Sequence, residues 1–152
     1  MKKGKPEQDH RSLALWAADC AERVLPYFEK EYPKDGRPRK AIETGRDWAR
    51  SDMLMRMSVV RAAALAAHAA ARGTDHPAAH AAARAAGQAV ATVHVAGHFS
   101  AAIDYAVKSA EAAGVAGERE WQYKRLPKDL RPLVKKMLVE KTKAQKKKMT
   151  RK

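Results

Sequence analysis

Residues 62–98 read AAALAAHAAARGTDHPAAHAAARAAGQAVATVHVAGH, an alanine-dense stretch that holds five of the six histidines. Alanine has the highest helix propensity of all residues, and its small side chain lets neighbouring helices approach closely. Gly73 and Pro77 divide the stretch, because glycine commonly ends a helix and proline commonly opens one. The stretch therefore predicts two alanine-rich helices that pack tightly inside a helical bundle.

The composition supports a single helical domain with an unusual core. The chain has 152 residues, of which 32 are alanine, and only 6% are aromatic. A chain of this length can bury one proper core. That core must consist mainly of small side chains, anchored by a few large ones: Trp16, Phe28, Trp48, Phe99 and Trp121.

Helical spacing of apolar residues recurs along the rest of the chain, and no strand pattern is present. The expected helices cover about residues 12–30, 38–50, 52–72, 76–92, 98–113, 118–125 and a last segment from 128 onward. We predict an all-α protein, a single irregular bundle of about six to seven helices with a basic, frayed C-terminal tail. The expected organisation is a flexible N-terminus (1–10), an all-helical domain (11–138) and the basic tail (139–152).

The positive charge is concentrated at the C-terminal end. The net charge is +14, and residues 124–152 hold 13 basic and 2 acidic residues, against 18 and 15 in the remainder. Non-specific binding of nucleic acid is possible through Lys141, Lys143, Lys146, Lys147, Lys148, Arg151 and Lys152. The tail lacks interleaved aromatic residues that would stack on bases, so we favour a solvated terminus.

Three features bear on location. A single cysteine allows no intrachain disulfide, which is typical of a reducing cytoplasm. Residues 1–10 are basic and polar with no apolar stretch after them, so they do not resemble a signal peptide. Residues 85–103 carry no formal charge, but their polar side chains and alanines indicate a buried helical region and no membrane span.

His94 and His98 stand four residues apart in the segment HVAGH. On an unbroken helix this spacing places both side chains on one face, where they can supply two zinc ligands. A tetrahedral site needs further ligands from other helices. Gly97 costs about 1 kcal/mol relative to alanine in a helix interior. Two courses are therefore open: the helix runs on through Gly97, or it breaks or kinks near residues 95–97. We favour hydrogen-bonded interior histidines over a metal site, and we expect no cofactor.

The first two helices carry many charged residues, and a further carboxylate follows the histidine pair. Together they form a candidate face for a partner or ligand: Asp19, Arg23, Arg37, Arg39, Lys40, Arg46, His94, His98 and Asp104. A carboxylate such as Asp19 beside an arginine of the next helix would pin the two helices together. The same residues can instead line a polar cleft for a charged partner. Helix pinning is the commoner use of such pairs, and we favour it.

No motif of the sequence indicates catalysis. Cys20 lies on the apolar stripe with Trp16 and Val24, so we expect a buried, unreactive thiol. The chain has no glycine-rich phosphate loop, no serine-centred nucleophile motif and no paired-carboxylate motif. We therefore expect that the protein is not an enzyme.

Three segments, taken in order, are similar to those of a known family. They are ALWAADCAERVL at 14–25, RPRKAIE at 37–43, and AAGQAV at 85–90 continuing to HVAGH at 94–98. Over roughly residues 11–135 the chain resembles the immunity proteins of the helical immunity-five-like family. The resemblance implies a small, cytoplasmic, all-helical bacterial protein of a polymorphic toxin system, in which an immunity protein binds and neutralises a partner toxin.

The leading hypothesis is therefore an immunity-type binding protein that sequesters a toxin. Mimicry of nucleic acid is disfavoured, because it needs an acidic surface and this chain is basic. Two alternatives stay open. One is a nucleic-acid-associated protein that acts through the tail, and the other is a small helical metalloprotein or enzyme centred on His94 and His98.

Overall fold

The computed structural model describes residues 4–51 and 54–151, and over these ranges it contains helices and loops but no strand. The helices are α1 (Lys5–Glu29), α2 (Arg37–Arg50), α3 (Met57–Arg72), α4 (Pro77–His94), α5 (Phe99–Ala112), α6 (Glu118–Arg125) and α7 (Arg131–Thr150). Short 3₁₀ segments, Ala96–His98 and Lys128–Leu130, precede α5 and α7. The prediction of an all-α bundle of six to seven helices is confirmed.

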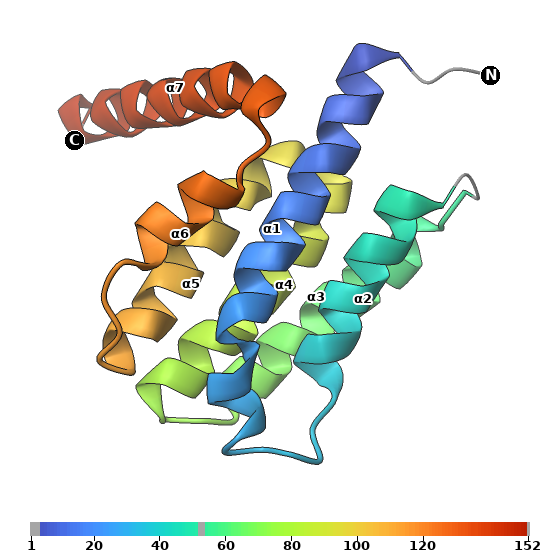
Figure 1. Ribbon diagram of the computed structural model, residues 1–152, viewed down its shortest axis with the longest axis vertical. Helices are drawn as coiled ribbons and strands as arrows, with labels where there is room; N and C mark the ends of the chain where they lie inside the picture. Colours follow the sequence, from blue (N-terminus) through green and yellow to red (C-terminus); the bar gives the residue numbers. More distant parts are fainter. Residues whose placement is uncertain (1–3, 52–53, 152) are drawn as a thin grey trace.

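Helix α4 lies at the centre of the bundle and packs against α1, α2, α3 and α5 (Figure 1). Twelve of its eighteen residues are buried, and eight of these are alanine. A helix that is apolar on every side must be enclosed by other elements. The alanines allow four neighbours to approach, because no large side chain holds them away.

The ends of three helices differ from the expected ones. Helix α1 begins at Lys5, and α3 begins at Met57. Ser51 has an extended backbone that ends α2, and the expected start of the next helix at 52 lies outside the described residues, as do residues 1–3 and Lys152. Helix α7 continues through the basic tail to Thr150, which agrees with the good helix propensity of lysine.

The long uncharged stretch of residues 85–103 does not form one helix. Helix α4 ends at His94, Val95 has an extended backbone, and α5 starts at Phe99. Among the described residues, no helix combines the length and the apolar character that a membrane crossing needs.

Helices α3 and α4 approach closely at Gly87. The imidazole ring of His68 on α3 lies over this glycine, and a Cβ atom built on Gly87 would stand 2.7 Å from two of its ring atoms. The ring is held in place by Arg84, whose Nη1 donates to His68 Nδ1 at 2.9 Å. The absent side chain of Gly87 therefore makes room for the imidazole.

Replacing Gly87 with alanine is expected to lower the free energy of unfolding by about 1 kcal/mol or more, although alanine is the better helix former. The cause is the clash with the His68 ring, which Arg84 prevents from moving freely. Urea unfolding followed by circular dichroism measures the change. In a His68→Ala background the same substitution should stabilise the protein, and equal effects in both backgrounds would contradict the prediction.

Candidate functional site

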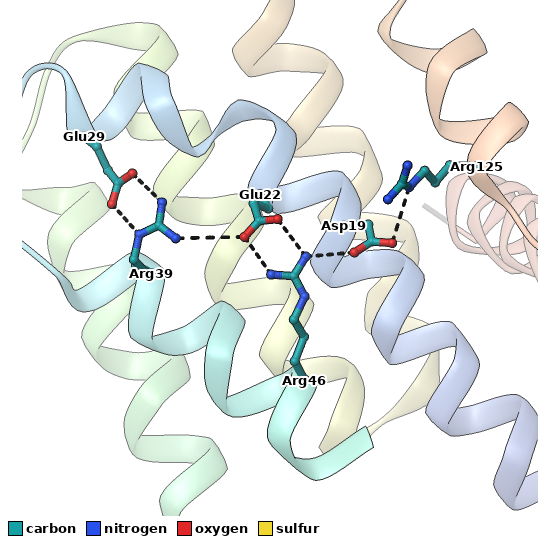
Figure 2. Close-up of polar contacts among 6 residues, drawn as sticks. All are labelled: Asp19, Glu22, Glu29, Arg39, Arg46 and Arg125. Carbon is teal, nitrogen blue, oxygen red and sulfur yellow. Dashed lines mark hydrogen bonds and ion pairs between the residues drawn. The ribbon is translucent and has the colours of Figure 1, made fainter. Parts of the chain in front are cut away.

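Arg46 on α2 joins two carboxylates of α1 (Figure 2). Its Nη1 donates to Glu22 Oε2 at 2.7 Å, and its Nη2 donates to Glu22 Oε1 at 2.9 Å and to Asp19 Oδ1 at 2.8 Å. The side chain of Arg46 is only 15% exposed, while Asp19 and Glu22 are 30% and 43% exposed. A paired guanidinium in this position fits carboxylate geometry well, because its donors form a rigid fork.

The same arrangement continues along the two helices in both directions. Arg39 makes two hydrogen bonds to Glu29, at 2.7 and 2.8 Å, and its Nη1 lies 3.9 Å from Glu22. At the other end, Arg125 of α6 lies 3.6 Å from Asp19. Figure 2 shows these six residues as one row of alternating charges, and we call it the charged ladder: Asp19, Glu22, Glu29, Arg39, Arg46 and Arg125.

Within the ladder, Glu22, Glu29 and Arg46 are stabilised in their ionised forms. Hydrogen bonding from Arg46 lowers the pKa of Glu22, and hydrogen bonding from Arg39 lowers the pKa of Glu29. The pKa of Arg46 is raised, first by its hydrogen bonds to Glu22 and then by those to Asp19. The ladder thus ties α1 to α2 and reaches α6, the geometry expected of helix pinning.

Two neighbouring residues of the candidate face also have intramolecular partners. Arg23 lies 3.5 Å from the buried carboxylate of Glu118, and its guanidinium is 4.6 Å from the ring centroid of Trp121. Arg37 makes hydrogen bonds at 2.7 and 2.9 Å to Asp35, in the loop before α2. Lys40 is exposed on α2.

Asp104 belongs to a different group of side chains. Arg119 Nη2 donates to Asp104 Oδ1 at 2.6 Å, and Lys141 of α7 lies 3.9 Å from its other oxygen. Lys141 also donates to Ser100 Oγ at 2.9 Å. These contacts attach α6 and the middle of α7 to α5, and they include the first of the tail lysines.

The two histidines of the HVAGH segment do not share a helical face. Helix α4 ends at His94, and His98 lies in the following 3₁₀ segment. His94 is exposed, whereas His98 is partly buried with Nδ1 3.0 Å from Gln88 Oε1. No group of three or more histidine, cysteine or acidic side chains is placed to hold a metal within residues 4–51 and 54–151.

Cys20 is a residue of α1 and is buried in the core. Burial raises the pKa of its thiol far above the usual range, and the nearby carboxylates of Asp19 and Glu118 add to this effect. A thiol that stays protonated is a poor nucleophile. The prediction of a buried, unreactive cysteine agrees with these surroundings.

We expect the protein to lose stability in two steps as the pH falls. Burial and the charge of Arg84 lower the pKa of His68 below its ordinary 6.5. As the pH falls, the His68 imidazole is therefore protonated in the unfolded chain before it is protonated in the folded protein, and the free energy of unfolding decreases from about pH 6.5 downward. Glu22, Glu29 and Asp35 have lowered pKa values. The stabilisation of the folded state by these carboxylates is complete above their pKa values in the unfolded chain, 4.5 for glutamate and 3.8 for aspartate. It is lost as the pH falls through their lower pKa values in the folded protein.

Urea unfolding between about pH 8 and pH 3 measures both steps. A His68→Gln variant should lack the upper step and keep the lower one. A free energy of unfolding that is constant from about pH 8 to pH 5 in the unsubstituted protein would contradict the role given to His68.

Comparison with known proteins gives one finding. The family model described as "Imm-5 like putative immunity protein" matches residues 5–129, which include α1 to α6 and all six residues of the charged ladder. No curated protein and no solved structure matches the chain significantly.

Proposed function

Because the chain belongs to the family of Imm-5 like putative immunity proteins, we propose that it is an immunity protein that binds a partner toxin and neutralises it. The family membership, over 5–129, is the observation that carries this proposal. The proposal places the protein in the bacterial cytoplasm, beside its toxin.

The chemistry of the described side chains supports a role in binding rather than in catalysis. The thiol of Cys20 is buried and stays protonated. The charged ladder is occupied by its own ion pairs, so we propose that it stabilises the scaffold and keeps α1, α2 and α6 in fixed positions. A rigid scaffold favours tight binding, because little ordering remains to be done when the partner docks.

The test uses the protein encoded by the gene next to this one. That protein is expressed from an inducible promoter in a bacterial host, with and without the immunity protein. We expect growth arrest alone, rescue on co-expression, and co-elution of the two purified proteins in size-exclusion chromatography. Unchanged arrest on co-expression, together with separate elution, would count against the proposed function.

A further inference from the structure

A groove lies between α6 and α7. It is separate from the charged ladder, and the family match assigns no role to it. Its volume is about 960 Å³, and its apolar surface comes from Tyr123, Leu126, Val134, Leu138 and Val139. The extended backbone of Leu126 ends α6 before Pro127, and Figure 1 shows α7 projecting away past α6 with its C-terminal half apart from the bundle. The two helices therefore diverge, and no described helix fills the space between them.

The rim of this groove, which we call the α6–α7 groove, is basic. Five cationic side chains line it: Lys124, Arg131, Lys135, Lys143 and Lys146. Glu120 is the single acidic residue among the lining residues, so the lining carries a net charge of +4. An apolar floor between cations is complementary to a ligand that has an apolar ridge flanked by carboxylates.

We infer that the α6–α7 groove binds an acidic, amphipathic helical segment of a partner protein. Apolar residues at every third or fourth position of that segment would enter the floor beside Leu138 and Val139. Its acidic residues would face the lysines of the rim. The volume of the groove, about 960 Å³, lies at the upper end of the range for small-molecule sites, about 300–1,000 Å³.

The other possible occupants fit the groove less well. A second copy of this chain would bring a net charge of +14 toward a basic rim. Single-stranded nucleic acid binds through phosphates and stacked aromatics, and Tyr123 is the one aromatic side chain among the lining residues. A lipid surface is flat and fits the convex face of an amphipathic helix rather than a concave space between two helices.

This inference rests on the proposed function in one respect, because the partner would be the toxin. Its chemistry can be tested without the toxin. The probe is a labelled synthetic peptide of about 18 residues, with leucines at helical spacing and glutamates between them, and fluorescence anisotropy measures its binding. A scrambled peptide of the same composition keeps the charge and loses the apolar ridge. We expect the first peptide to bind and the scrambled one to bind at least about tenfold more weakly.

Two matched pairs of variants locate the binding. The groove triple, Lys135→Glu, Lys143→Glu and Lys146→Glu, reverses three rim charges. The control triple, Lys136→Glu, Lys147→Glu and Lys148→Glu, makes the same change on exposed α7 residues that do not line the groove. Val139→Asp in the floor is matched by Val59→Asp on α3, because these valines are 46% and 49% exposed.

We expect the groove triple and Val139→Asp to weaken peptide binding about tenfold or more, and the two controls to change it little. Equal loss in both triples would overturn the inference, because it would mean that the peptide responds only to net charge. Failure of the amphipathic peptide to bind would also overturn it. A third result would overturn it as well: the peptide binds all variants alike, whereas an oligonucleotide or phosphatidylserine vesicles lose binding only to the groove triple. Circular dichroism confirms that each variant is folded.

The growth assay then separates this inference from the proposed function. Rescue by the unsubstituted protein and by the control triple, but not by the groove triple, would support both. Rescue by the unsubstituted protein, the control triple and the groove triple alike would overturn the groove as the toxin site and leave the immunity function in place. No rescue by the unsubstituted protein would overturn the immunity function, and the peptide experiment would then decide the groove by itself.

Discussion

Replacing Trp16 with alanine is expected to lower the free energy of unfolding by about 4 kcal/mol. The side chain is only 2% exposed and lies in a core made mostly of alanine. Its ring centroid is 5.9 Å from that of Phe99, and its Nε1 donates to the backbone oxygen of Gln122 at 2.9 Å. The substitution removes a large buried ring, and it leaves a buried carbonyl without this partner.

The alanine-rich composition of the core makes the loss severe. Alanine side chains have no rotamers with which to fill the cavity, so the surrounding helices would have to move. A domain is commonly stable by about 5–15 kcal/mol, so this substitution should remove between about a quarter and four fifths of the free energy of unfolding. Thermal and urea unfolding followed by far-UV circular dichroism measure the change.

Trp121 offers a matched comparison, because it is a tryptophan that is only partly buried. Arg23 and Arg125 lie over its ring, at 4.6 and 5.6 Å from the centroid. Trp121→Ala should cost about 1–2 kcal/mol. If the two substitutions cost the same, Trp16 does not have the anchoring role given to it here.

Local signals predicted the order of helices well. Gly73 and Pro77 separate α3 from α4 as expected. Of the two courses left open at 95–97, the structure has the break, since α4 ends at His94 and a 3₁₀ segment follows. These features depend on backbone preferences of a few adjacent residues, which sequence reasoning can weigh directly. The start of α3 was less predictable, because no strong N-cap residue is placed directly before Met57, where Arg56 occupies the cap position.

The charged ladder was predicted only in part. Asp19, Arg39 and Arg46 were candidate residues, but Glu22, Glu29 and Arg125 were not among them. A signal for two of these exists in the numbering. Helices α1 and α2 are consecutive, antiparallel and joined by a short loop, so the numbers of two residues that face each other add up to a constant. Glu29 with Arg39 gives the same sum as Glu22 with Arg46. Arg125 follows no such rule, because its position depends on how α6 packs.

The groove depends on the angle between α6 and α7, and no local signal encodes that angle. The charge run predicts a solvated basic tail, and it does not indicate which of these residues face a neighbouring helix. In the structure Arg131, Lys135, Leu138, Thr142 and Lys146 all line the groove. They follow one another at intervals of three or four, which is the spacing of one helical face.

Replacing Arg46 with methionine is expected to lower the free energy of unfolding by about 2 kcal/mol. Methionine keeps much of the length and apolar contact of the arginine stem but removes three hydrogen bonds to Asp19 and Glu22. The two carboxylates would then face each other without the intervening cation. Because both are partly exposed, water reduces the penalty below that of a fully buried pair.

Two further variants assign this loss to the charges. Arg39→Met removes a pair whose arginine is 44% exposed, so it should cost less than about 1 kcal/mol. Adding Asp19→Asn and Glu22→Gln to Arg46→Met should recover part of the loss, because the carboxylates that lacked a partner become neutral. Urea unfolding of the four proteins at neutral pH provides the comparison.

The dependence on pH distinguishes ion pairing from packing. Arg46 lowers the pKa of Glu22, so the pairing stabilises the folded state above the unfolded pKa of 4.5 and is lost as the pH falls through the lower folded value. In Arg46→Met the carboxylates have no such partner, so this protein has less to lose in acid. The two stabilities should therefore converge between about pH 5 and pH 3. A difference that stays constant over this range would mean that the arginine acts through the packing of its stem and not through its charge.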